Sequence, residues 1–232
     1  LPSLAELAEA RGLKTGIVST ARITHATPAG SYAHDANRNW EDSASLPPEA
    51  KAAGCKDIAQ QLLDTPYGDG PDVILGGGRA HFLPDSVVDP EHSKKTGKRD
   101  DGRNLIEQWL QSRSGREYVW NRQDFLALSE RRAKGEGSNG QVMGLFEPSH
   151  MQFEADRAND PAGEPSLLEM TQFALAEMQK AEQGYFLLIE AGRIDHAHHG
   201  SNAYRALVDT VALSEAVQWV TDHVDLSDTL IL

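Results

Sequence analysis

The sequence predicts an α/β protein in which a mainly parallel central sheet carries helices on both faces. The first observation is that apolar stretches of strand length alternate along the chain with amphipathic stretches of helix length, a pattern typical of parallel sheets. The second is that 39% of the 232 residues are hydrophobic, which is enough for one sizeable core or most of a larger one. The third is that the chain contains no internal repeat and no low-complexity segment.

The helices follow from their capping residues and their apolar periodicity. Ser3 is expected to cap the first helix and Gly12 to end it. Helices are expected at residues 3–10, 47–64, 104–113, 165–181 and about 202–224. In the fourth helix one face holds Leu167, Thr171, Ala174 and Met178. In the fifth the expected buried residues are Leu207, Val211, Val217, Val220 and Val224.

The strands follow from short apolar stretches bounded by turn residues. They are expected at residues 14–20, 72–78, 117–121, 141–147, 184–190 and 229–232. A polar loop fills residues 21–46, and an irregular insertion region is expected at about 79–150, most clearly at 81–102. Because the carboxyl ends of parallel strands gather at one edge of the sheet, the residues after Thr20, Leu75 and Leu188 are expected to lie near one rim.

Composition and chain ends limit the possible functions. The formal net charge of −13 argues against binding to nucleic acid or to an anionic membrane surface. No stretch reaches transmembrane length, and Cys55, the single cysteine, has no partner for an internal disulfide. The chain opens directly into a helix and ends on DTLIL, which resembles the start of a strand. Residues 1–232 are therefore expected to form one partial domain, truncated at both ends.

Two polar constellations follow predicted strands. In IEAGRIDHAHHG, Glu190 ends a strand, and Asp195 and His199 have the i, i+4 spacing that places two side chains on one helix face. A carboxylate and an imidazole suit zinc, while Glu190 could reach a harder ion such as magnesium. In THATPAGSYAHDANRNW, Thr27 offers a hydroxyl and Arg38 a planar fork for phosphate oxygens.

Both constellations also fit simpler interpretations. The first could be a set of solvated loop residues, and the second an ordinary loop with a surface arginine. Five of the nine histidines fall in the two stretches, which favours a metal site. The stretch DVILGGGR lacks the Lys-Ser/Thr ending of a phosphate-binding P-loop and is interpreted as a tight turn after a strand.

Taken together, THATPAGSYAHDANRNW, DVILGGGR, MGLFEP and IEAGRIDHAHHGSNAYRAL resemble the alkaline phosphatase family, particularly its animal-type branch, in the expected order through nearly the whole chain. The family consists of zinc- and magnesium-dependent phosphomonoesterases on an α/β fold. The resemblance implies that Asp195 and His199 bind zinc, that Glu190 and Thr27 bind magnesium, and that Arg38 holds the substrate phosphate. It also places His25 and His196 close to the metals without making them ligands.

The animal-type branch also has a calcium site. The resemblance assigns it to Glu91, Glu147 with the carbonyl of Phe146, and Glu164, where the family commonly has aspartate. The serine nucleophile of the family and its other zinc ligands have no counterpart within these residues, and a cysteine like Cys55 usually pairs with one upstream. A free Cys55 thiol, buried in the fold, is the other interpretation.

The function expected from the resemblance is phosphomonoester hydrolysis through a phosphoserine intermediate, with no turnover by residues 1–232 alone. Phosphomonoesters and inorganic phosphate are the expected ligands, and the full-length protein is expected to be an exported homodimer, periplasmic or extracellular, with or without a membrane anchor. Two alternatives stay open: another phosphatase or sulfatase of the same superfamily, and a non-catalytic calcium- or zinc-binding module. Arg38 distinguishes the non-catalytic module from the two enzyme classes, because a structural ion site needs no phosphate-binding residue.

Overall fold

The computed structural model describes all residues from Leu1 to Leu232, which fold around one five-stranded sheet. The strand order is β3–β4–β2–β1–β5, and every neighbouring pair is parallel. The strands are β1 (Lys14–Arg22), β2 (Val73–Gly77), β3 (Glu117–Val119), β4 (Val142–Leu145) and β5 (Tyr185–Glu190). The sequence-based prediction of a parallel sheet is confirmed. The strand β2 is buried throughout, whereas β5 lies at the edge and is half-buried along its whole length.

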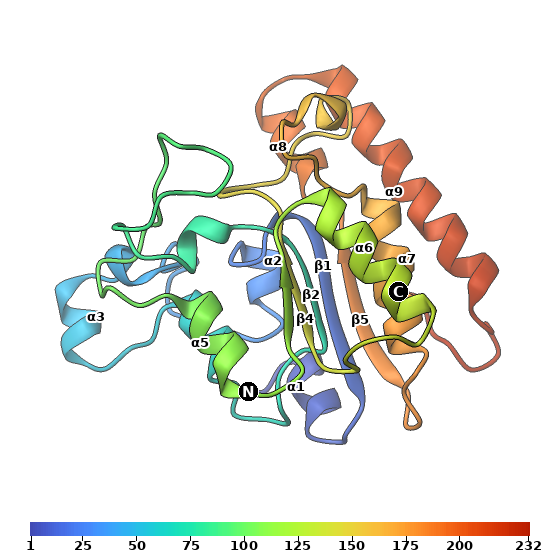
Figure 1. The fold of residues 1–232 in the computed structure, drawn as a ribbon, viewed down its shortest axis with the longest axis horizontal. Coiled ribbons are helices and arrows are strands. Elements are labelled where there is room, and N and C mark those ends of the chain that lie inside the picture. Colours follow the sequence, from blue (N-terminus) through green and yellow to red (C-terminus); the bar gives the residue numbers. More distant parts are fainter.

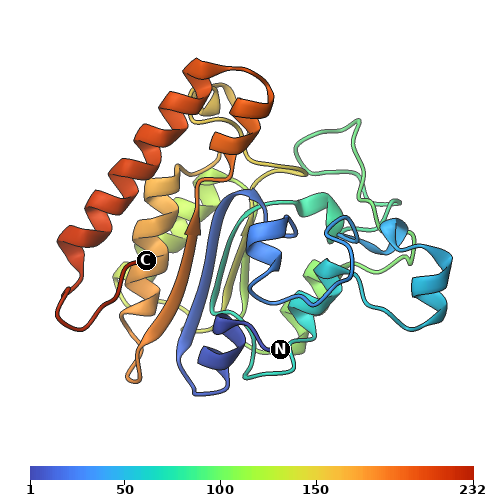
Figure 2. The same ribbon diagram turned by 180° about the vertical axis from the view of Figure 1, so that it is seen from behind.

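Helices cover both faces of this sheet, as predicted (Figure 1). One face carries α2 (Ala26–Ala29), α4 (Ile58–Leu63) and α5 (Leu105–Ser112), and its core centres on Ile17, Ile74 and Trp109. The other carries α6 (Arg122–Ala133), α7 (Leu167–Met178) and α9 (Ala203–His223), with Leu75, Phe146 and Met170 in its core. Figure 2 shows these two layers from behind. The remaining helices are α1 (Leu4–Glu9), α3 (Pro48–Ala52) and α8 (Arg193–His199), with 3-10 turns η1 (Ser43–Ser45), η2 (Arg79–His81) and η3 (Arg157–Asn159).

Side-chain caps define where several helices begin. Ser3 and Ser166 each form a capping box with the glutamate three residues later, as predicted for Ser3. Asn104 and Asn202 accept the backbone N–H at the third helical position of α5 and α9. These hydrogen bonds satisfy N–H groups that a helix start leaves free. The expected bounds of α1, α5, α7 and α9 are therefore close to the observed ones.

Four expectations about elements are wrong. The helix expected at residues 47–64 is interrupted by Gly54, which has a φ of +76°, so two short helices replace it. The helix α6 was not expected, and residues 229–232 form no strand. The apolar side chains expected in the core from α9 are not buried: Leu207 is 67% exposed, and the helix instead buries Ala206, Asp209 and Ala216.

The irregular segment between η2 and α5 is held by two buried arginines. Arg79 donates to both carboxylate oxygens of Asp89 at 2.8 and 2.9 Å, and Arg99 donates to both of Asp57 at 2.9 and 3.0 Å. All four side chains are almost fully buried, and such bidentate pairs fix geometry as well as charge. Beyond this segment, residues 79–150 also contain α5, β3, α6 and β4, so the wider region is not irregular throughout.

The fold brings the carboxyl ends of β1, β2 and β5 to one rim, because β1 lies between the other two in a parallel sheet. The short helix α8 follows β5 at this rim (Figure 1). None of the helices combines the length and apolar character needed to cross a lipid bilayer. Cys55 is a free thiol and is exposed rather than buried.

Candidate metal centre

The carboxylate of Glu190 is held at the rim by two neighbours. Glu190 ends β5 and pairs in register with Ser19 of β1, whose hydroxyl donates to Glu190 Oε2 at 2.5 Å. Ser19 is fully buried, and its own oxygen accepts the N–H of Ala21. A Cβ at Gly192 would lie 3.1 Å from Glu190 Oε2 and 2.8 Å from the Ala21 Cβ. Glycine at this position therefore leaves the room that the carboxylate occupies.

Asp195 and His199 meet on α8 as their spacing predicted. Asp195 Oδ2 lies 3.5 Å from His199 Nε2, and the two side chains are 69% and 79% exposed. An exposed pair of this kind contributes little to stability. The same two atoms are spaced as neighbouring ligands of a tetrahedral zinc ion would be, about 3.3 Å apart at zinc–ligand distances near 2 Å.

The loop after β1 carries the second constellation to the same rim. His25 precedes α2, and Arg38 NH2 donates to His25 Nε2 at 3.0 Å. Thr27 lies on α2, which packs against both β1 and β5. The rings of His25 and His196 are 5.3 Å apart, so the two constellations form one site. His34 is not part of it, because its ring is bonded to Glu6 at 2.8 Å.

A third histidine, His150, completes a cluster that the sequence did not indicate. Its ring centroid lies 4.0 Å from that of His196 and 5.1 Å from that of His25, and the three rings are close enough to offer ligand atoms to one ion. The chain after β4 reaches the rim because Gly78, with a φ of +100°, donates its N–H to the carbonyls of Glu147 and Ser149. The tight turn predicted for DVILGGGR is thus confirmed, and it positions His150.

Each ring of this histidine cluster accepts a hydrogen bond from an arginine. Arg22 contacts His150, Arg38 contacts His25, and Arg193 NH1 lies 3.1 Å from His196 Nδ1. Burial lowers the pKa of His150 to about 2 and that of His196 to about 4, with Arg22 and Arg193 respectively adding to the effect. The pKa of His25 is also lowered, mainly by burial and to a smaller extent by the positive charges of Arg22 and Arg38. All three imidazoles are therefore neutral at physiological pH.

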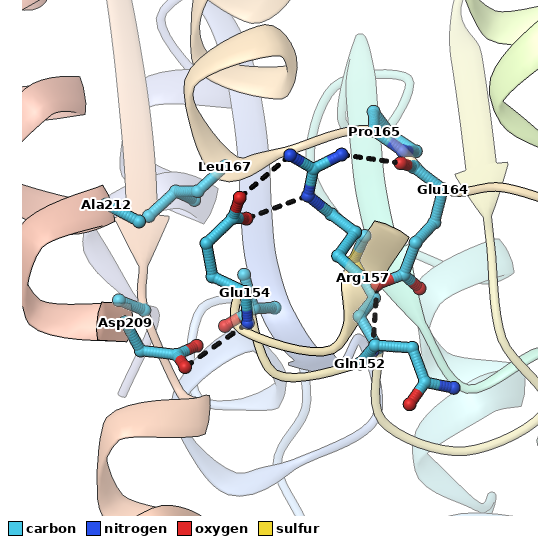
Figure 3. A pocket seen from close by; sticks show the side chains of 11 residues that line it. Gln152, Glu154, Arg157, Glu164, Pro165, Leu167, Asp209 and Ala212 are labelled. Carbon is cyan, nitrogen blue, oxygen red and sulfur yellow. Dashed lines mark hydrogen bonds and ion pairs between the residues drawn. The ribbon is translucent and has the colours of Figure 1, made fainter. Parts of the chain in front are cut away.

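A second group of acidic side chains lies beside α7. Glu147, Asp160 and Glu164 offer carboxylate oxygens that lie within 4.8 Å of one another, and Glu91 and His92 form a similar group with Glu147. Glu164 is 1% exposed. One of its oxygens accepts the N–H of Gln152 at 2.8 Å (Figure 3), and the other, Oε2, has no partner. Three of the expected calcium ligands are thus brought together, and Phe146, which offers a carbonyl, directly precedes Glu147.

Nearby cations compensate only part of the charge repulsion at this acidic group. Arg157 is turned toward Glu154, to which it donates two hydrogen bonds (Figure 3). Two carboxylates within 4.8 Å of each other repel each other by at least about 3 kcal/mol at an effective dielectric constant near 20. Burial and the neighbouring Glu147 raise the pKa of Glu164 to about 9, and burial with Glu91 raises that of Asp160 to about 7. The group therefore stays partly protonated unless a cation joins it.

The structure is that of an α/β protein with carboxylates, imidazoles and an arginine guanidinium grouped at the carboxyl ends of its parallel strands. The family model for alkaline phosphatase matches residues 1–232. The chain belongs to the alkaline phosphatase family.

Named relatives agree with this assignment. The membrane-bound alkaline phosphatase of Bombyx mori is 42% identical over 99% of this chain, and the tissue-nonspecific isozyme of Gallus gallus is 43% identical over 93%. The crystal structure of Thermus thermophilus alkaline phosphatase has a TM-score of 0.74 over 97% of the chain, at 30% identity. The chain spans 41% of the length of each of the two curated relatives and 39% of the Thermus chain.

Proposed function

We propose that the complete protein hydrolyses phosphomonoesters with zinc and magnesium at the rim formed by β1, β5 and α8. The observation that carries the proposal is the contact of Arg38 with His25, beside the helix that presents Asp195 and His199. A guanidinium next to metal-ligating side chains suits a phosphate group, which it can bind through two oxygens. A structural metal site would not need this arginine.

The residues at the rim fit the proposed metals. Asp195 and His199 are spaced for one zinc ion and are open to solvent. Glu190, oriented by Ser19, and the exposed hydroxyl of Thr27 offer the oxygen ligands that magnesium prefers. When bound, these metals would activate a nucleophile and stabilise charge on the leaving group.

The residues of this chain prepare the site for an anion. Arg38 would bind the non-bridging oxygens of the phosphate and stabilise the charge that spreads over them during transfer. The neutral rings of His25 and His196 can accept or donate hydrogen bonds without adding charge of their own. Ser19 cannot attack the substrate, because it is fully buried and its proton is donated to Glu190. The resemblance to the family implies that the phosphoserine intermediate would use a serine outside residues 1–232.

The acidic group beside α7 is proposed as a calcium site formed by Glu91, Glu147, Glu164 and the carbonyl of Phe146. The unpartnered and deeply buried Oε2 of Glu164 supports this proposal, because a buried charge needs a counter-charge or a metal. An all-oxygen donor set suits calcium rather than zinc. We also propose that the complete protein forms a homodimer, as the family resemblance implies, and that it is exported, in keeping with the membrane-bound alkaline phosphatase of Bombyx mori.

The test is phosphatase activity of the complete protein with an Arg38→Ala variant. We expect the metal-loaded protein to hydrolyse an aryl phosphate, and Arg38→Ala to lower kcat/KM at least tenfold. Inorganic phosphate should raise the melting temperature of the parent protein and raise that of Arg38→Ala much less. Arg131→Ala is the matched control and should behave like the parent, because it removes an exposed arginine on α6 that pairs with Glu117 of β3. An inactive metal-loaded parent protein would refute the proposal.

A further inference from the structure

Asp160 places a fourth carboxylate in the acidic group beside α7. Its oxygens lie within 4.8 Å of those of Glu147 and Glu164. Both of them are buried from solvent, and neither has a hydrogen-bond donor in the protein. A carboxylate that accepts no hydrogen bond in a protein interior is rare. When it is ionised among three other carboxylates, this side chain needs a cation as its partner.

The backbone around Asp160 directs this side chain inward. Asp160 ends the turn η3 and precedes Pro161, which restricts it to an extended conformation, and the observed φ of −68° and ψ of 125° agree. Two residues later the N–H of Ala162 donates to Glu91 Oε1 at 3.4 Å. The segment that carries Asp160 is therefore tied to Glu91 of the acidic group through its backbone.

No protein cation is free to neutralise Asp160. Arg79 forms its bidentate pair with Asp89 and reaches only Glu91, at 3.4 Å, and Arg157 is paired with Glu154. His92 Nε2 lies 3.3 Å from Glu147 Oε2 and is the only histidine in the two acidic groups. Four carboxylates thus face one space, and their protein counter-charges are two shared or partial ones, Arg79 at Glu91 and His92 at Glu147.

We propose that Asp160 is a direct ligand of the cation held by Glu91, Glu147 and Glu164, so that this site has four carboxylate ligands and selects calcium over magnesium. The proposal rests on the calcium site proposed above and adds a residue to it. Magnesium is usually held by one or two carboxylates and keeps several waters, whereas calcium takes six to eight oxygen ligands, so four carboxylates in one place suit calcium. Since the number of charged ligands sets calcium affinity, removing Asp160 should weaken it.

The experiment is a calorimetric titration of calcium into the complete protein after treatment with EGTA. Asp160→Asn keeps the size of the side chain and removes its charge, and we expect calcium affinity to fall at least tenfold with an unchanged number of sites. Asp156→Asn is the matched control, because it removes the same charge four residues away, where Asp156 pairs with Arg205 on the surface; its calcium affinity should stay within twofold of the parent.

The outcomes separate this proposal from the calcium site itself. If the parent protein binds no calcium, the calcium site is refuted together with the role of Asp160. If the parent binds calcium and Asp160→Asn binds it equally well, only the role of Asp160 is refuted. The melting temperature in EGTA is the second measurement: Asp160→Asn should equal or exceed the parent, because repulsion is relieved. A variant that unfolds in EGTA would show that Asp160 is structural and would also overturn the proposal.

Discussion

Ser19 is a buried hydroxyl that orients Glu190, a residue we propose as a magnesium ligand. Its proton is donated to Glu190 Oε2, and its oxygen is held by the N–H of Ala21. Residues that orient metal ligands commonly change metal affinity 10- to 100-fold when they are removed. We predict that Ser19→Ala in the complete protein raises the magnesium concentration needed for half-maximal activation about tenfold. Activity at saturating magnesium should change less.

This prediction has a matched control in Ser112→Ala. Ser112 donates its hydroxyl to the carbonyl of Trp109 on α5, away from the rim. The magnesium requirement of this variant should equal that of the parent. An unchanged magnesium requirement in Ser19→Ala, measured by titration of the metal-free enzyme, would show that Glu190 does not need Ser19 or does not bind magnesium.

The candidate site could be predicted at the residue scale only where its contacts are local or belong to a recognised motif. Asp195 and His199 are one helical turn apart, so their approach follows from spacing alone. His150 and Asp160 follow no such rule. Each reaches its cluster through chain reversals that depend on the tertiary fold, and a single histidine or Asp-Pro pair is too common in sequences to indicate a ligand. The three glycines after β2 were the available signal for His150, because their lack of side chains indicates that another stretch of backbone packs closely against them.

At the scale of elements, the turn after β2 determines where the chain after β4 runs. A Cβ at Gly77 would lie 2.2 Å from the carbonyl oxygen of Ser149, which is a backbone atom and cannot turn aside. We predict that Gly77→Ala lowers the free energy of unfolding by about 3 kcal/mol, at the upper end of overpacking costs. Gly102→Ala provides the comparison: it has open space and only a positive φ of +72°, which costs about 1 kcal/mol. Urea unfolding of both variants measures the difference, and equal losses would contradict the proposed contact.

The helices could be predicted where capping residues and apolar periodicity agreed. The predictions were wrong where tertiary packing determines which residues form a helix or are buried. The helix α6 buries only Phe125, Leu128 and Arg132, so its apolar stripe is too weak to stand out. The helix α9 also has only a weak apolar period, and it buries Ala206, Asp209 and Ala216 rather than its larger apolar side chains. The long helix expected at residues 47–64 ends early because Gly54 takes a positive φ. The stop at Gly54 is a local signal of the same kind as Gly12, whereas the outcomes for α6 and α9 depend on tertiary packing.

At the scale of the whole molecule, the distribution of acidic groups sets how stability depends on pH. The net charge is −13, and several buried carboxyl groups have raised pKa values. Burial raises the pKa of Glu9 to about 7, of Asp35 to about 6 and of Asp209 to about 6. In each case the folded state holds a proton that the unfolded chain releases at lower pH. These carboxyl groups therefore make folding stability fall as the pH rises from about 4.5 to 7, while the three histidines with lowered pKa values act in the opposite direction below pH 6.5.

Glu9 allows this dependence to be tested far from both metal sites. It accepts the hydroxyl proton of Thr15 at 2.5 Å and is 9% exposed. Raising its pKa from 4.5 to about 7 corresponds to about 3 kcal/mol of stability lost above pH 7, as an upper figure. The variant Glu9→Gln has no proton to release. We predict that its free energy of unfolding, relative to the parent, increases by about 2 kcal/mol between pH 4.5 and pH 8, because the contributions of all other groups cancel in the difference. Urea unfolding of both proteins at several pH values, in EGTA, measures it, and a difference that stays constant with pH would show that Glu9 is ionised in the folded state.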